Sequence, residues 1–126
     1  MSAPRQLSLC LPAQPEFVGV ARLTLAGLAS RLGLDIQQVE DVKVAVAEAM
    51  TLLLQAAGET GEITLRATWD AAHLEIEVSG DGPAVELERE EAAIAIMVME
   101  ALMDTARWEP RAGRPCVRLG KARPAP

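Results

Sequence analysis

Two neighbouring stretches of alternating apolar and polar residues lie in the middle of the chain and limit its possible folds more than any other feature. They read EITLRATW (62–69) and HLEIEVS (73–79), and only Asp70, Ala71 and Ala72 separate them. A period of two is typical of strands with one buried face, and so short a connection joins antiparallel neighbours. The sequence therefore predicts a β-hairpin whose apolar face must be covered by other elements.

Segments on both sides of the hairpin can provide that cover. Their apolar residues recur at helical spacing in three runs, and two further runs alternate as strands do. The predicted helices are residues 16–32, 35–58 and 86–103, and the predicted strands are RQLSLCL (5–11) and CVRLGK (116–121). The order along the chain is thus strand, helix, helix, hairpin, helix, strand.

This order predicts an α+β fold. We expect a two-layer α/β sandwich in which a mixed, mostly antiparallel sheet is covered on one face by about three helices. The chain has 126 residues and no internal repeat, so residues 1–121 are expected to form one domain. Residues 122–126, which contain only Ala, Arg and Pro, are expected to be a disordered tail.

Charge and composition exclude several classes of function. The net charge is −6, and a protein that binds a nucleic-acid backbone needs a basic face instead. The sequence contains no apolar run of about 18 residues and no signal peptide, so we expect a cytoplasmic protein without a membrane partner. Cys10 and Cys116 lack metal-ligand spacing, and His73 stands alone, so no metal site is expected.

One carboxylate interrupts the apolar run VAVAEAMTLLLQAA (44–57). On a helix the neighbours of Glu48 three and four positions away are Val44, Ala45, Thr51 and Leu52, and none is a cation. Glu48 therefore either reaches water at the edge of the packed face, or sits in a cleft and meets a partner from elsewhere in the chain.

Three motifs in this order carry a resemblance to a known family. ARLTLAG (21–27), VEDVKVAVAEAMT (39–51) and ALMD (101–104) resemble the anti-sigma factor serine kinases of bacterial partner-switching systems, which belong to the GHKL (Bergerat) ATPase superfamily. The similarity extends from about residue 7 to residue 121. It implies the two-layer fold above and, in active members, a site for ATP and Mg²⁺.

The family's second helix carries the motif E-A-x-T-N, followed by a His. The resemblance assigns Glu48 to the catalytic carboxylate, and Ala49 and Thr51 also match. However, Leu52 stands where the family has the Asn that holds Mg²⁺, and Ala56 replaces the His. Because Mg²⁺ takes oxygen ligands, an aliphatic side chain cannot replace that Asn.

The family's adenine-binding motif is D-x-G-x-G. The aligned positions here are Gly80 for the Asp, then Asp81, Gly82 and Ala84. Asp81 lies one residue late, and a shift of one residue at a strand end points a side chain to the other face. The turn GDGP (80–83) could either cradle a phosphate through its N–H groups or serve only as a turn.

The remaining parts of the nucleotide site are altered too. The glycines of a G-x-G motif at the start of the last helix correspond to Ala93 and Ala95, and residues 85–92 are too few for the family's ATP lid. Gly113 lacks the Thr that follows it in the family. Loss of several elements of one site indicates a pseudokinase with no cofactor.

Three functions follow from the resemblance. The first is an anti-sigma-like regulator that binds a sigma factor or a STAS-domain anti-anti-sigma protein without phosphorylating it. Arg22 matches an Arg by which the family contacts its partner, and it is equally consistent with a solvated helix residue. The second is a serine kinase that still uses ATP and Mg²⁺, with Glu48 as base and Asp81 replacing the lost Asp. The third is a subunit that mainly forms a dimer, either with a second copy of this chain or with another protein.

Overall fold

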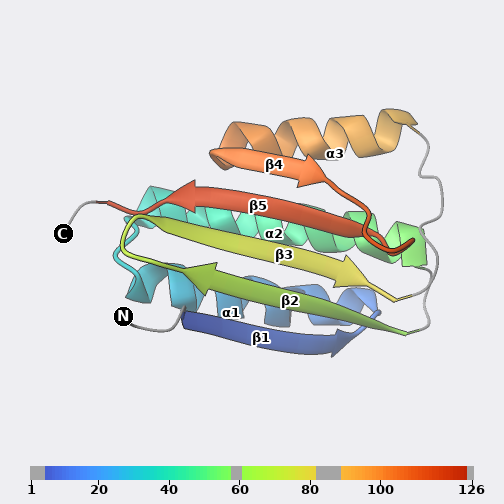
Figure 1. Ribbon diagram of the computed structural model, residues 1–126, viewed down its shortest axis with the longest axis horizontal. Coiled ribbons are helices and arrows are strands. Elements are labelled where there is room, and N and C mark those ends of the chain that lie inside the picture. Colours follow the sequence, from blue (N-terminus) through green and yellow to red (C-terminus); the bar gives the residue numbers. More distant parts are fainter. Residues whose placement is uncertain (1–4, 58–60, 82–88, 125–126) are drawn as a thin grey trace.

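The computed structural model describes residues 5–57, 61–81 and 89–124. Figure 1 shows its helices and strands, labelled in chain order. The elements are β1 (Arg5–Pro12), η1 (Pro15–Phe17), α1 (Val18–Arg31), α2 (Ile36–Ala57), β2 (Glu62–Trp69), β3 (His73–Gly80), α3 (Arg89–Leu102), β4 (Thr105–Trp108) and β5 (Cys116–Ala122). The predicted hairpin and the predicted helices are confirmed, with α3 described from Arg89 onward.

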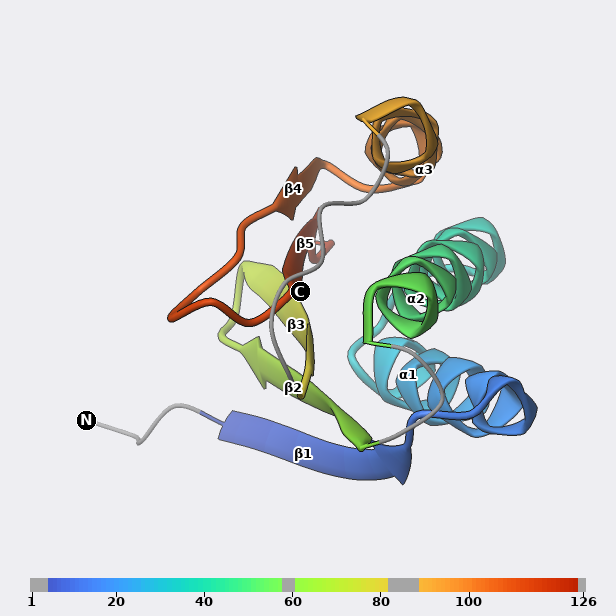
Figure 2. The ribbon, with the colours of Figure 1, turned by 90° about the vertical axis from the view of Figure 1, so that its right-hand side faces the viewer.

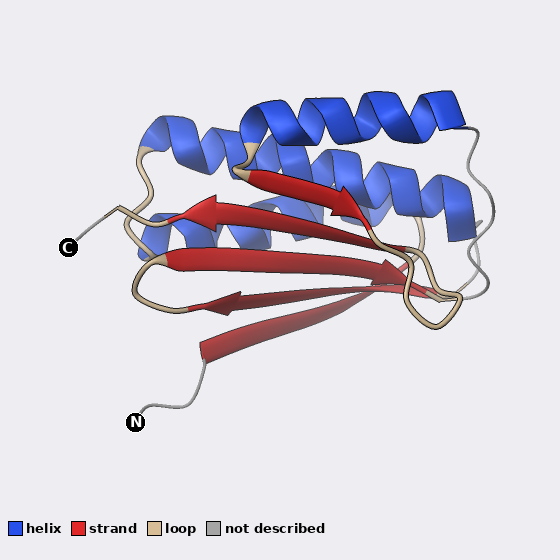
Figure 3. Cartoon of the chain, turned by 45° about the horizontal axis from the view of Figure 1, so that its top comes forward, coloured by secondary structure: helices blue, strands red, loops and turns tan. Residues whose placement is uncertain are grey.

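The strands form a single sheet in the order β1-β2-β3-β5-β4. Each adjacent pair of described strands is antiparallel, so the sheet is not mixed as the sequence had suggested. All three helices pack on one face of this sheet, with α2 between α1 and α3 (Figure 2). No described helix covers the other face, which we call the uncovered face, as the view in Figure 3 also shows. The α+β two-layer fold is therefore confirmed.

The hairpin explains where the core lies. In β2 and β3 the alternating apolar residues are buried against the helices, and Leu65 pairs with Val78 across the hairpin. The helices bury small and aliphatic side chains against them, among which Leu25 and Met50 are completely inaccessible to solvent. Among the described residues no polar or charged side chain is fully buried, so burial of aliphatic surface holds the two layers together.

The junction between α1 and α2 follows from local sequence signals. Gly33 adopts a positive φ of 89° directly after α1, a conformation that glycine takes without steric cost. Two residues later the Asp35 carboxylate accepts the N–H of Gln38, and the Gln38 amide oxygen accepts the N–H of Asp35. This reciprocal pair caps the N-terminus of α2 and fixes the direction in which the long helix starts.

Lys121 connects the end of the sheet to two helices. Its Nζ donates a hydrogen bond to the Leu102 carbonyl oxygen at 2.7 Å, at the C-terminus of α3. The same Nζ lies 3.7 Å from an Asp41 carboxylate oxygen on α2, and the lysine side chain is only 11% exposed. A cation is favourable at a helix C-terminus because of the helix dipole. Asp41 and Leu102 are thereby held together at this end of the helix layer.

Two features of the chain were not predicted. β4 is a short edge strand that pairs with β5 after α3 ends, and the sequence had suggested no strand there. In addition, the C-terminal segment is ordered beyond residue 121: Ala122 belongs to β5, and Arg123 donates hydrogen bonds to the carbonyl oxygens of Leu32 and Asp70. The expected tail is therefore too long by at least these residues, and its last two residues, 125–126, lie outside the described ones.

None of the helices in the described ranges is long and apolar enough to cross a membrane.

At the turn between β2 and β3, the Asp70 carboxylate accepts the N–H groups of Ala72 and His73, both at 2.8 Å. These two hydrogen bonds lower the pKa of Asp70, and the bond from Ala72 contributes more than the bond from His73. His73 is exposed beside this turn, and the described residues contain no cluster of three or more His, Cys, Asp or Glu side chains suited to a metal.

Candidate functional site

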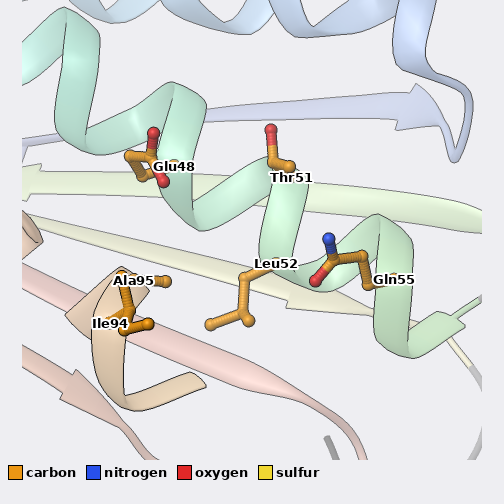
Figure 4. A pocket seen from close by; sticks show the side chains of 6 residues that line it. All are labelled: Glu48, Thr51, Leu52, Gln55, Ile94 and Ala95. Carbon is orange, nitrogen blue, oxygen red and sulfur yellow. The ribbon is translucent and has the colours of Figure 1, made fainter. Parts of the chain in front are cut away.

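A pocket of about 280 Å³ lies between α2 and α3. Figure 4 shows the side chains that line it, which come from one face of α2 and from the first half of α3: Glu48, Thr51, Leu52, Gln55, Ile94 and Ala95. At the pocket, the second half of α2 lies beside the start of α3. At the other end, Lys121 contacts both Asp41 in the first half of α2 and Leu102 at the end of α3. The two helices therefore run antiparallel. The pocket is therefore part of the contact between two packed helices.

Among the described side chains that line this pocket, Glu48 is the only charged one. It is half-buried, and within the described ranges no ion pair and no side-chain hydrogen bond involves it. Thr51 and Gln55 add a hydroxyl and an amide along the same helix. The pocket thus presents one carboxylate and two neutral polar groups on an otherwise apolar wall.

Leu52 occupies the position at which the sequence comparison with the kinase motif expected a metal-binding Asn. It points from α2 toward α3, on the side where Ile94 and Ala95 lie (Figure 4). Its side chain is only 2% exposed and belongs to the hydrophobic core. Leu52 therefore forms a wall of the pocket and packs against the core at the same time.

The two alanines expected to replace phosphate-binding glycines differ in position. Ala95 lines the pocket and is partly buried, whereas Ala93 is exposed and does not line it. Ile94 between them contributes a lining side chain although 62% of it is exposed. The start of α3 therefore presents an apolar surface to the pocket.

Asp81 lies on the other side of the sheet. Gly80 ends β3 in a buried position and donates its N–H to the Pro115 carbonyl oxygen at 3.0 Å. The Asp81 carboxylate accepts the N–H of Glu62 at 3.1 Å and lies 3.8 Å from the Arg114 guanidinium. Because residues along a strand alternate between faces, Asp81 follows Glu77 and Ser79 onto the uncovered face. The structure does not bring it together with Glu48.

Other expected site residues are distributed more widely. Arg22 is exposed on α1, which lies on the opposite side of α2 from α3 (Figure 2). Gly82 and Ala84 fall outside the described residues, as does the side chain of Ala56. Of the positions aligned with the nucleotide site, the pocket thus brings together Glu48, Leu52 and Ala95.

Sequence reasoning missed two residues of the pocket. Gln55 lies seven positions after Glu48, a spacing that returns a helix to the same face, so the periodicity of α2 could have identified it. Ile94 carried no such signal, because its place in the pocket depends on how α3 packs against α2.

A second cavity, of about 230 Å³, lies on the uncovered face of the sheet. Its lining contains acidic and basic side chains from β3, β4, β5 and the residue after β4: Glu75, Thr105, Arg107, Glu109, Arg118 and Leu119. Arg118 and Glu75 are 3.3 Å apart, and Arg111 and Glu77 form a further ion pair at 3.8 Å. Two of the four charged lining residues, Glu75 and Arg118, thus pair with each other.

Comparisons with known proteins agree with this architecture. Residues 11–121 match the histidine kinase-like ATPase domain. The serine-protein kinase RsbW of Oceanobacillus iheyensis is 35% identical over 127 residues, which cover 85% of this chain and 80% of the relative. RsbW of Bacillus subtilis is 32% identical over 127 residues, covering 85% and 79%.

A solved structure has the same fold. The crystal structure of the RsbU and RsbW domains of Rv1364c from Mycobacterium tuberculosis matches 96% of this chain with a TM-score of 0.71, at 21% sequence identity. This chain corresponds to 34% of that longer chain. From the domain match and the RsbW relatives together it follows that the chain belongs to the histidine kinase-like ATPase family, in the group of anti-sigma factor serine kinases that includes RsbW.

Proposed function

We propose that this chain is an anti-sigma-type regulator that acts by binding a protein partner, and that its former nucleotide site no longer supports phosphoryl transfer. The observation that carries the proposal is Leu52, a core side chain at the position of the family's metal-binding Asn. Mg²⁺ accepts oxygen ligands in near-octahedral geometry, and Leu52 offers none. The described residues therefore do not fit an Mg²⁺-nucleotide.

The charge of the pocket supports the same proposal. Glu48 is the only charged residue in the described lining, and ATP carries several negative charges, so carboxylate and phosphates would repel each other without a metal between them. Asp81 is engaged by Glu62 and Arg114 on the uncovered face. It is therefore badly placed to replace the adenine-binding Asp.

The relatives support a shortened lid. The alignment with the Oceanobacillus relative is 127 positions long, which is more than the 85% of this 126-residue chain that takes part in it. The relative therefore has residues with no counterpart in this chain. In our proposal the shortening falls between β3 and α3, a span that contains residues 82–88, which lie outside the described ones. A chain without a lid cannot enclose a nucleotide away from water.

The proposed partner is a sigma factor or a STAS-domain anti-anti-sigma protein, and such a regulator would act in the cytoplasm. Arg22 is exposed on α1 and is our candidate partner contact. Loss of the nucleotide site leaves α1 and the fold of the domain unchanged. Arg31, at the other end of α1 and also exposed, provides a matched control for removal of a positive charge.

An active serine kinase is the second candidate, because Glu48 is retained in the pocket beside Thr51 and the relatives are named serine-protein kinases. Calorimetric titration with ATP and Mg²⁺ separates the two candidates. The proposal expects no heat of binding at millimolar nucleotide and no phosphate transfer to purified STAS proteins. Saturable binding of Mg²⁺-ATP would refute the loss of the nucleotide site.

Partner binding is tested separately by pull-down and calorimetry with the purified sigma factors and STAS proteins of the same organism. We expect one of them to bind, and Arg22→Ala to weaken that complex while Arg31→Ala leaves it unchanged. If none of these proteins binds, the anti-sigma proposal is wrong.

A further inference from the structure

We infer that the groove between α2 and α3 is a docking site for an amphipathic helix of the protein partner, with an Arg or Lys of that helix bound to Glu48. This inference rests on the proposed function, because it assigns a chemistry to the partner that the regulator binds. We define the α2/α3 groove by the side chains along its two walls. They are Val44, Glu48, Thr51 and Gln55 on α2, with Ile94 and Val98 on α3.

The antiparallel packing of the helices aligns these two walls. Glu48 and Gln55 line the pocket together with Ile94, and Asp41 is joined to Leu102 through Lys121. Residues between these two anchor points must therefore face each other, which places Val98 level with the turn of α2 that joins Val44 to Glu48. The α2 positions 44, 48, 51 and 55 follow spacings of 4, 3 and 4 and so form one stripe along the helix. That stripe is about 16 Å long, or about three helical turns.

Several large apolar side chains along the groove are exposed to solvent. Val44 is 43% exposed, Val98 37% and Ile94 62%, and Met97 beside them on α3 is 68% exposed. Grouped apolar side chains that remain in water mark binding surfaces more often than scattered ones do. A groove of this kind fits a helix that lays its apolar face between two others.

The negative charge of the groove indicates that the docking helix of the partner is basic. Within the described ranges no ion pair involves Glu48, and exposed acidic side chains lie near both ends of the groove. Glu40, which pairs with Lys43 at 3.2 Å, lies one turn before Val44, and Glu90 lies one turn before Ile94. The whole chain has a net charge of −6. A carboxylate on an apolar wall is complementary to an Arg or Lys, whose aliphatic stem packs on the wall while its head meets the carboxylate.

The same charges argue against two other occupants. A second copy of the chain related by two-fold symmetry would place one acidic groove against another, and like charges across an interface are unfavourable. A nucleotide would bring phosphates beside Glu48. A basic amphipathic helix is the occupant that turns each of these charges into a favourable contact.

The test uses the full chain and whichever purified sigma factor or STAS protein of the same organism binds it, with affinities measured by calorimetry. Glu48→Gln keeps the shape of the side chain and removes its charge, and we expect it to weaken binding at least about 10-fold. Ile94→Asp should weaken binding to a similar extent. Circular dichroism confirms that each variant is folded.

Two control variants carry the same chemical changes elsewhere. Glu75→Gln removes one negative charge on the uncovered face of the sheet, and Ile36→Asp introduces an acid at a residue that is 85% exposed at the start of α2. Both should bind within about twofold of the unaltered chain. Replacement of single Arg and Lys residues in the partner by Glu, tested against Glu48→Lys, should identify one that restores affinity.

The outcomes separate the two proposals. If the unaltered chain binds no sigma factor and no STAS protein, the proposed function fails and this inference fails with it. If a partner binds but Glu48→Gln and Ile94→Asp bind as tightly as the controls, only the groove assignment is overturned. A homodimer in light scattering that Ile94→Asp dissociates would also overturn it, because the occupant would be a second copy.

Discussion

Leu52→Asn restores the family's metal-binding side chain and tests whether that position has become part of the core. Leu52 is 2% exposed, so the substitution removes almost a complete leucine side chain from the interior, a loss of about 2 to 3 kcal/mol. It also places an amide among apolar neighbours, which adds about 1 to 3 kcal/mol where its hydrogen bonds are unmet. Gln55, one turn along α2, can meet part of that need.

We therefore expect Leu52→Asn to lower the free energy of unfolding by about 4 kcal/mol. For a chain of this size that corresponds to a decrease in Tm of roughly 15 °C. Urea denaturation followed by tryptophan fluorescence measures the change, since Trp108 lies partly buried in β4 next to β5. The variant should still not bind Mg²⁺-ATP, because Gly80 and Ala95 remain.

Leu23→Asn is the matched control, because Leu23 undergoes the same chemical change on α1 but is 66% exposed. It should lose only about 1 kcal/mol, from lower helix propensity and a smaller loss of burial. Equal stability of the two variants would show that Leu52 is not packed, and would refute the conversion of this position to core. Binding of Mg²⁺-ATP by Leu52→Asn would show instead that one residue separates this chain from an active nucleotide site.

Three further predictions concern residues of β5 and the residue that follows it. Lys121→Met should destabilise the chain by about 2 kcal/mol in urea denaturation, because it leaves Asp41 without its cation in a partly buried site and removes the hydrogen bond to α3. Arg123→Gln should lower Tm by a few degrees, roughly the effect of 1 kcal/mol, because the carbonyl oxygen of Leu32 loses its guanidinium donor. An unchanged Tm would mean that the contacts of Arg123 contribute nothing to stability. Burial raises the pKa of the Cys116 thiol to about 11, so the unfolded chain ionises this thiol first. Stability contributed by the neutral thiol should be present below about pH 9 and be lost as the pH rises toward 11, and Cys116→Ala should show a weaker decline in unfolding free energy over that range; an identical decline would refute the assignment.

The sequence predicted most of the fold because its periodic segments are long. The hairpin and α2 have uninterrupted patterns of period 2 and 3.6, and their boundaries in the structure differ from the expected ones by a residue or so. β4 was missed because Thr105–Trp108 is too short to establish a period, and because its partner β5 lies across an intervening loop. Pairing between segments that are separated in the chain is not encoded in local spacing.

The candidate site was only partly predictable for a similar reason. The direction of Asp81 follows from counting along β3, since Ile76, Val78 and Gly80 share the covered face and Asp81 must then face away. The burial of Leu52 could not be predicted in this way, because the helix is apolar on several sides and only the packing of α3 determines which side is enclosed. The contribution of Ile94 depends on that packing too.

The strand order has a consequence for how this protein is made. β5 is the last of the described strands to leave the ribosome, yet it lies inside the sheet between β3 and β4. Among the described strands β4 pairs only with β5, so neither β4 nor the Lys121 contact to α3 can form until residues 116–122 have been synthesised. A nascent chain that stops earlier can pair β1, β2 and β3, but it lacks the Lys121 hydrogen bond that holds the end of α3. Translation through residue 122 is therefore required before the five described strands can complete the sheet and fix the end of α3 to it.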